Sequence, residues 1–289
     1  MNLFAIAAAA SPGLGDLLAH SFMRNAFLAG TAIAAASGLV GYFVVLRSQV
    51  FSADALSHVA FTGALAALAI GVDARLGLFG ATIAVAVLIG VGGRGGRADD
   101  VVIGTVFTAV LGVGVLCLSI YTRSGSGANG AANVNVLFGS IFGLGPAQAR
   151  LAALIGAAVC IGVLVIARPL LFASLDPAAA RARGVPVGAI GVGFLVLLAV
   201  CAAEATQAVG ALLLVGLIAG PGGAAHRLAT RPWAGLAIAT GIAVGATWLG
   251  LVASYRFGSI PPSFAIIAIV TAVYALSVAV SIGSNRAHR

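Results

Sequence analysis

Long apolar runs separated by short polar breaks make up almost the whole chain. A helix needs about 20 mostly apolar residues to cross the hydrocarbon core of a bilayer. The pattern predicts spanning helices over residues 22–46, 54–71, 76–92, 100–121, 148–172, 185–206, 207–226, 233–254 and 261–282. Because 54–71 and 76–92 are short for a crossing, we expect about eight or nine transmembrane helices. The predicted fold is all-α and polytopic, a single transmembrane domain over residues 1–289 that begins with a short segment, residues 1–20.

The composition indicates that lipid is the main solvent of this chain. Hydrophobic residues form 61% of it and charged residues only 8%, and the mean hydropathy is +1.16. A soluble domain carries roughly 25% charged residues, which cover its surface. The 40 glycines, together with many alanines, also predict that the helices pack closely through small residues.

The net charge of +8 comes from arginine, because the chain has no lysine. The arginines stand singly at the ends of apolar runs, as the positive-inside rule requires, and no basic stripe indicates a nucleic-acid partner. The larger group lies on one predicted side: Arg47, Arg94, Arg97, Arg168, Arg181, Arg183, Arg227, Arg231, Arg286 and Arg289. The smaller group lies on the other side: Arg24, Arg75, Arg123, Arg150 and Arg256. This imbalance predicts a cytoplasmic C-terminus and an external N-terminus.

Two segments predict interruptions in the helices. Residues 122–147 begin as a polar external stretch and end as an apolar one that is too short to cross, which is typical of a re-entrant or surface-lying helix. Pro221, followed by two glycines inside a predicted span, predicts a helix break or a flexible helix.

A short helix is predicted between two long spans, near residues 175–184. Asp176 suits the N-cap and Pro177 the first helical position, while Gly184 and Pro186 end the helix. It would carry Arg181 and Arg183. From the residues alone two interpretations stay open: a simple connection that caps the spans, or a projection that docks a cytoplasmic partner.

Asp54 and His58 are the first candidate site residues. They are four apart and so share one face of a predicted spanning helix. A carboxylate and an imidazole one turn apart suit a divalent cation such as Zn²⁺ or Mn²⁺, and an ionisable residue inside a span is a functional hypothesis by default. The alternative is an aspartate that caps the start of its own helix, with a hydrogen-bonded histidine nearby.

Glu204 is the other acid that falls inside a span, near its outer end. Two interpretations remain for it as well. It is either an interfacial carboxylate that faces water or part of an entry path for cations.

The chain lacks the motifs of an enzyme. It has no GxxxxGK[ST] loop, and without lysine the usual phosphate-binding loop of an ATPase cannot be built. It also has no Gly-x-Ser-x-Gly, no HExxH and no paired carboxylates within one span. We therefore expect no catalytic residue, and any ATP hydrolysis must come from another chain.

Five stretches in order resemble the permeases of the zinc/manganese/iron ABC importer family. They are GYFVVLRSQVFSADALSHVAFTGALAA, ADDVVIGTVF, VNVLFGSIFGL, DPAAARARGVPV and VGALLLVGLIAGPGGAAHRLAT. The first is similar to the family's hallmark segment, and the resemblance covers residues 22–282. The chain departs from the family pattern at Ser48, Ala53, Ser140 and Gly222.

This resemblance implies a type II ABC-importer permease bundle in the cell membrane. It implies a cytoplasmic ATP-binding subunit, a second permease copy and an extracellular or periplasmic metal-binding protein as partners. Asp54 and His58 match the metal pathway, and the segment from Asp176 to Gly184 matches the helix that docks on the ATPase. The cargo would be a divalent metal ion, Zn²⁺ first, with Mn²⁺ and Fe²⁺ as alternatives, and no permanent cofactor is implied.

Two other functions remain as alternatives. A permease for a metal chelate, such as a siderophore or cobalamin, would not need the Asp54–His58 pair, and that class is typically longer by one span. An ion-coupled secondary transporter would need inverted repeats and several intramembrane ionisable residues, and the sequence shows neither.

Overall fold

The computed structural model describes residues 19–93, 99–123, 139–211 and 214–287. Within these residues it contains only helices, which confirms the predicted all-α fold. The α-helices are α3 (Ser21–Leu46), α4 (Val50–Ala69), α5 (Ala74–Gly92), α6 (Asp100–Arg123), α8 (Pro146–Leu175), α9 (Pro177–Ala182), α10 (Val187–Val209), α11 (Leu214–Leu228), α12 (Pro232–Phe257) and α13 (Pro262–Ala287). A 3₁₀ turn, η2 (Ile141–Gly143), precedes α8. Most of the expected segment 1–20 and of the connection 122–147 lies outside the described residues.

Eight of these helices are long and apolar enough to cross a membrane, which confirms the expected number. The span predicted over residues 207–226 is wrong in its bounds. The α10 helix continues to Val209 and ends at Gly210, whose φ of +94° lies in the left-handed region that favours glycine. After Gly210, α11 has only 15 residues and a length of about 22 Å, which is less than the hydrocarbon thickness. Apolar composition alone does not show where a helix stops.

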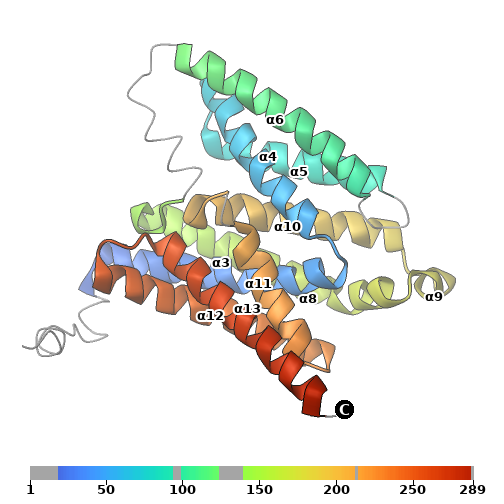
Figure 1. Ribbon diagram of the computed structural model, residues 1–289. Coiled ribbons are helices and arrows are strands. Elements are labelled where there is room, and N and C mark those ends of the chain that lie inside the picture. The colour runs from blue at the N-terminus through green and yellow to red at the C-terminus, as the bar shows by residue number, and fades with distance from the viewer. Residues whose placement is uncertain (1–18, 94–98, 124–138, 212–213, 288–289) are drawn as a thin grey trace, which may run out of the picture.

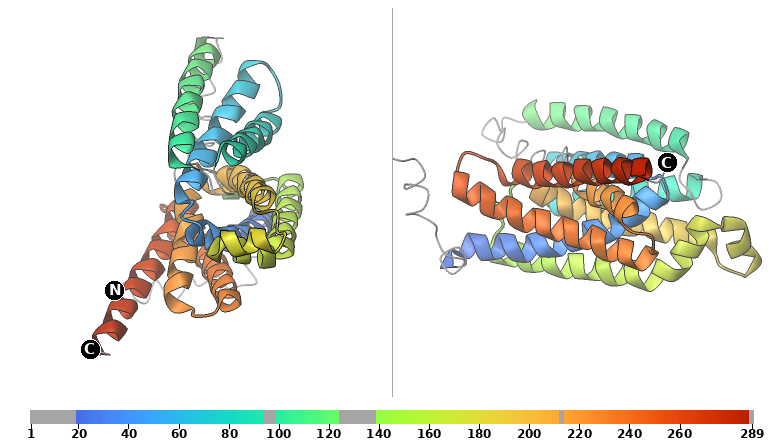
Figure 2. Two further views of the ribbon diagram at one scale, coloured as in Figure 1. Left: turned by 90° about the vertical axis from the view of Figure 1, so that its right-hand side faces the viewer. Right: turned by 60° about the horizontal axis from the view of Figure 1, so that its bottom comes forward.

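The helices form three neighbouring groups (Figures 1 and 2). The first holds α4, α5 and α6, and the second holds α3, α8 and α10. The third holds α11, α12 and α13, and packs on the second mainly through α3. The short α9 projects at one end of the bundle, beyond the ends of α8 and α10 (Figure 1).

Apart from the short α9, the α-helices that follow one another along the chain run in alternate directions, and this sorts the arginines between the two ends of the bundle. The α3 and α12 helices are antiparallel, because Gly30 lies against Thr247 while Gly38 lies against Thr240. At the end where α3 begins lie Arg24, Arg75, Arg150 and Arg256. At the end where α3 finishes lie Arg47, Arg168, Arg181, Arg183, Arg227 and Arg231. The predicted separation into two groups is thus confirmed for these ten residues.

Small residues let the helices approach closely, as the glycine and alanine content predicts. A β-carbon on Gly63 of α4 would overlap the carbonyl of Gly77 on α5, and the reverse also holds. A similar crossing joins α3 to α11, where Gly41 meets the backbone of Ile218 and Gly222. Backbone-to-backbone contact of this kind maximises van der Waals packing, which drives helix association in lipid.

The predicted helix break at Pro221 is wrong. The α11 helix runs without interruption from Leu214 to Leu228, and Pro221 is buried inside it. A proline removes one backbone hydrogen bond and strains the preceding turn. Here the next residue, Gly222, packs directly on the backbone of Gly41 in α3, so tertiary contact holds the helix together. The interruption lies earlier, at Gly210.

Candidate functional site

Asp54 and His58 lie one turn apart on α4. Asp54 Oδ1 and His58 Nε2 are 3.8 Å apart, which is too far for a hydrogen bond. The Asp54 side chain is 40% exposed and that of His58 is 20% exposed. Both polar groups are therefore open to a further ligand, and their separation leaves room for a bridging cation.

The interpretation of Asp54 as a helix cap is wrong. The α4 helix begins at Val50, and the residue before it, Gln49, makes no side-chain capping bond. Asp54 thus lies in the second turn, where the backbone N–H groups already have partners within the helix. Beside the pair, the His58 ring lies 5.4 Å from the ring of Phe107 on α6, so α6 covers one flank of the histidine.

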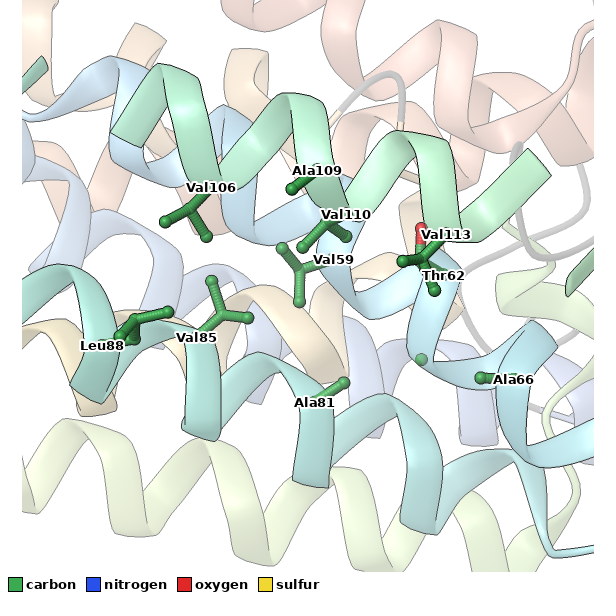
Figure 3. A pocket seen from close by; sticks show the side chains of 11 residues that line it. Val59, Thr62, Ala66, Ala81, Val85, Leu88, Val106, Ala109, Val110 and Val113 are labelled. Carbon is green, nitrogen blue, oxygen red and sulfur yellow. The ribbon is translucent and has the colours of Figure 1, made fainter. Parts of the chain in front are cut away.

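One copy of the chain supplies few metal ligands. The described residues contain no group of three or more histidine, cysteine, aspartate or glutamate side chains that could hold a metal ion. An apolar cleft of about 350 Å³ lies between α4, α5 and α6 (Figure 3). Among the residues that line it only Thr62 has a polar side chain, so the cleft is not itself a cation site.

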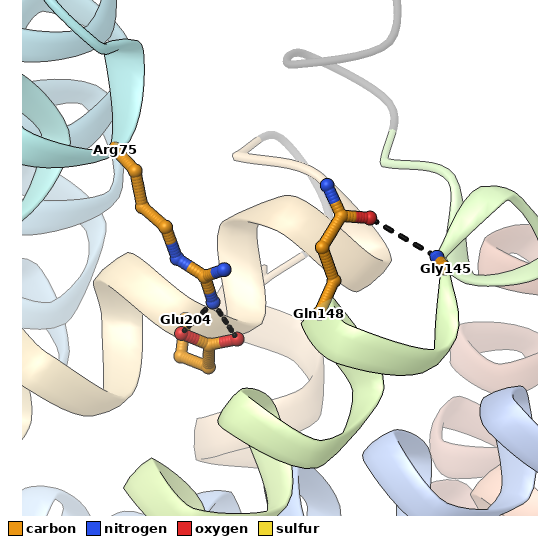
Figure 4. Close-up of polar contacts among 4 residues, drawn as sticks. All are labelled: Arg75, Gly145, Gln148 and Glu204. Atoms are coloured by element: carbon orange, nitrogen blue, oxygen red, sulfur yellow. Dashed lines mark hydrogen bonds and ion pairs between the residues drawn. The ribbon is translucent and has the colours of Figure 1, made fainter.

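Glu204 forms an ion pair with Arg75 (Figure 4). Both carboxylate oxygens accept hydrogen bonds from Arg75 Nη2, at 2.9 and 3.0 Å. The Glu204 side chain is only 5% exposed, so the expectation that it faces water is wrong. Its position near the end of α10 places it opposite the start of α5. In this structure its carboxylate is compensated by a guanidinium, and it does not join Asp54 and His58 in one cluster.

The short helix predicted near residues 175–184 is present as α9. Asp176 caps it, because one carboxylate oxygen accepts from the N–H groups of Ala178 and Ala179 at 3.1 and 2.9 Å. Gly184 follows with a φ of +80°, which turns the chain toward α10. Ala180 is fully buried, so α9 is anchored on its neighbours rather than hanging free.

The outer face of α9 carries the charge. Arg181 and Arg183 are exposed. The guanidinium of Arg183 lies 5.5 Å from the centre of the Phe172 ring, which limits the directions it can take. The helix therefore presents a small, rigid, basic surface at the end of the bundle that holds the larger arginine group.

Sequence reasoning missed the structural role of Arg47, which it treated only as a marker of orientation. Arg47 is 3% exposed, and its Nε donates to Gln49 Oε1 at 3.1 Å. Its Nη1 donates to Ser174 Oγ on α8 at 3.2 Å, and its guanidinium lies 5.7 Å from the Phe194 ring centre on α10. Arg47 thus joins the ends of three helices just before α4 begins. The sequence did contain a signal for this role, because Arg47 lies in GYFVVLRSQVF, part of a stretch that resembles the permease family.

The comparisons with known proteins agree with this architecture. A model of the ABC 3 transport family matches residues 19–281. The manganese transport system membrane protein MntC of Halalkalibacterium halodurans is 29% identical over 217 residues, 75% of this chain and 73% of the relative. The chelated iron transport system membrane protein YfeD of Yersinia pestis is 26% identical over 265 residues, 91% of this chain and 87% of the relative.

A solved structure has the same fold. A chain of PsaBC from Streptococcus pneumoniae, in complex with Fab, matches with a TM-score of 0.78 at 23% identity, over 95% of each chain. This match confirms the expected fold of the helical bundle. Since the family model covers nearly the whole sequence and the helical bundle agrees with it, this multi-pass membrane protein belongs to the ABC 3 transport family.

Proposed function

We propose that the chain is the membrane-spanning permease subunit of an ATP-driven importer whose cargo is a divalent transition-metal ion. The observation that carries the proposal is the Asp54–His58 pair, an acid and an imidazole that share one face of a spanning helix and are both partly exposed. A carboxylate inside a membrane protein is costly unless water, a partner or a cation compensates it. A passing metal ion supplies that compensation.

We place Mn²⁺ and Fe²⁺ ahead of the Zn²⁺ expected from the ligand types. The relatives described above are named for manganese and for chelated iron. Asp54 offers an oxygen ligand that suits Mn²⁺, and His58 offers a nitrogen ligand that suits Fe²⁺ as well as Zn²⁺. A weak site is what transport requires, because the ion must leave the site as readily as it enters.

The proposed transporter contains two permease copies. Among the described residues one copy contributes Asp54 and His58 to this site, and a second copy facing it across a shared pathway would double this to four ligands. Four ligands match the coordination number of a tetrahedral metal site. On this view residues 1–289 act as one transmembrane domain, and Glu204 stays outside the ligand set because Arg75 occupies its carboxylate.

Energy would come from a cytoplasmic ATP-binding subunit that docks on α9. Support comes from the cap at Asp176, the turn at Gly184 and the exposed Arg181 and Arg183, which together make α9 a rigid projection. The end of the bundle that carries α9 also holds most of the arginines, and the positive-inside rule makes that end cytoplasmic. The α13 helix ends on the same side, so the C-terminal end would be cytoplasmic, and the whole transporter would lie in the cell membrane. An extracellular or periplasmic metal-binding protein would deliver the ion at the opposite end.

Metal uptake tests the proposal directly. Cells that lack this chain are supplied with it, and the uptake of Mn²⁺, Fe²⁺, Zn²⁺ and chelated iron is measured side by side. Restored uptake of a free divalent ion, with an ATPase subunit that co-purifies, supports the proposal. Restored uptake of chelated iron alone would favour a chelate permease instead. ATP hydrolysis by the purified chain on its own would contradict the assignment as a permease subunit.

A further inference from the structure

The ion pair between Arg75 and Glu204 supplies no ligand to the proposed metal site, and burying it costs free energy. Glu204 is nearly buried, and the Arg75 side chain is 23% exposed. Removing two charges from water costs free energy that their attraction offsets only when the geometry is good. Here Arg75 Nη2 reaches both carboxylate oxygens, while Arg75 Nε is buried and has no hydrogen-bond partner among the described residues. Replacing such a pair by apolar residues often leaves stability unchanged. Stability alone therefore does not explain why the protein has this pair.

The position of Arg75 suggests that reason. Arg75 is the second residue of α5, and Gly77, two residues later, is the point at which α5 meets the backbone of Gly63 on α4. The backbones of α4 and α5 are in direct contact at this point, so the start of α5, where Arg75 lies, is placed against α4.

Ala203, the residue before Glu204, adds a second contact between α10 and the α4–α5 hairpin. Ala203 of α10 packs in a small buried cluster with Ala60 and Ala64 of α4 and Leu78 of α5. Ala60 stands only two residues from His58 on the same helix. The ion pair and this cluster thus seat the α4–α5 hairpin on α10, and the cluster reaches α4 two residues from His58.

We propose that Arg75 and Glu204 form a clamp that positions the α4–α5 hairpin on α10 and so places Asp54 and His58 for metal passage. The inference rests on the metal role of that pair proposed above. An apolar contact of small residues does not fix how far one helix is shifted along the other, whereas the charge-assisted contact of Arg75 Nη2 with both Glu204 oxygens fixes the distance between these two side chains. Arg75 and Glu204 are positioning residues, because they act on the metal through α4 and do not touch it.

The test measures Mn²⁺ uptake against Mn²⁺ concentration in cells that carry the complete transporter. The variants are Glu204→Gln, Arg75→Gln, the double neutral variant and the charge-swapped double variant Arg75→Glu, Glu204→Arg. Arg150→Gln is the matched control, since Arg150 is an exposed arginine at the same end of the bundle. Changing groups that orient metal ligands typically costs about 10- to 100-fold in affinity or activity, so we expect the half-saturating concentration to rise by about 10-fold in each single variant.

The pattern among variants separates positioning from general stabilisation. A clamp predicts that the double neutral variant is no worse than either single variant, that the charge-swapped variant regains most of the affinity, and that Arg150→Gln changes nothing. An unchanged half-saturating concentration in folded Glu204→Gln, while Asp54→Asn abolishes uptake, would overturn the clamp alone. Normal uptake by Asp54→Asn would overturn the metal role and the clamp with it.

A variant that fails to fold still leaves the inference testable. If an unpaired charge prevents folding of the single variants, the apolar double variant Arg75→Met, Glu204→Leu leaves no charge behind. Folded protein of this variant with a raised half-saturating concentration supports the clamp. Folded protein with normal Mn²⁺ affinity overturns it.

Discussion

Gly63 of α4 and Gly77 of α5 approach so closely that a β-carbon on either would overlap the carbonyl group of the other. This contact packs the two helices of the hairpin that carries Asp54 and His58 backbone to backbone. It also links the proposed metal ligands on α4 to the ion pair at the start of α5. The packing of two glycines thus bears on function as well as on stability.

The first prediction concerns this contact. Gly63→Ala should lower the free energy of unfolding by about 1–3 kcal/mol, because the added methyl group forces the two helices apart. The thermal stability of the purified protein in detergent measures the effect. Gly80→Ala on α5 is the control, since a β-carbon there meets no atom within 4 Å. Equal stability of the two variants would contradict the crossing described here.

The second prediction concerns the metal pair. Asp54→Asn removes the charge and keeps the shape, and His58→Gln removes the imidazole while keeping some hydrogen bonding. Residues that only orient a metal ligand contribute about 10- to 100-fold to metal affinity or activity. Removing a ligand itself should therefore lower metal uptake by at least that factor. The amount of folded protein and the co-purified ATPase should stay unchanged.

The control for this experiment is His20→Gln, an exposed histidine at the other end of the bundle. It should leave uptake normal. If the Asp54–His58 pair were only structural, the result would be reversed: less folded protein, with normal uptake per folded molecule. That result would reject the metal role but not the membership of the family.

The third prediction concerns α9. Ala182→Pro places a proline in the last turn of this helix, and an interior proline costs about 3 kcal/mol. Because α9 has only six residues, it should unwind, and uptake and ATPase association should fall together while the protein still inserts in the membrane. Uptake and co-purification are measured in the same membranes.

A charge reversal separates the shape of α9 from its charge. Arg181→Glu with Arg183→Glu should also weaken ATPase association, whereas Arg231→Glu, at the same end of the bundle but before α12, should not. If Ala182→Pro leaves ATPase binding intact, the segment is a simple connection and not a docking site.

The fourth prediction concerns Arg47. Arg47→Met keeps an unbranched side chain that can still pack against its neighbours but removes the hydrogen bonds to Gln49 and Ser174. Hydrogen bonds to charged groups contribute about 1.5–3 kcal/mol each, so thermal stability should fall clearly. Arg47→Lys should restore little, since an ammonium group cannot reproduce the planar geometry of a guanidinium. Full rescue by lysine would show that only the charge matters.

The sequence alone determined most of the membrane architecture. Eight of the nine predicted ranges correspond to the eight helices long enough to span, and their bounds differ by a few residues. The start of α9 at Asp176 and its end before Gly184 were also predicted correctly. These features are local: lipid requires an apolar run of sufficient length, and a cap depends on residues two or three positions apart.

Tertiary structure decided the features that depend on contact between distant residues. Glu204 and Arg75 are 129 residues apart, and only the packing of α5 on α10 brings them together. In the same way, the contact of Gly222 with Gly41 holds α11 intact through Pro221, where the local pattern predicted a break. The chemistry of a side chain shows what kind of partner it needs, but the packing of the helices decides which residue becomes that partner. In lipid, that is decided by the fit of small residues along the helix faces, which periodicity in one segment cannot reveal.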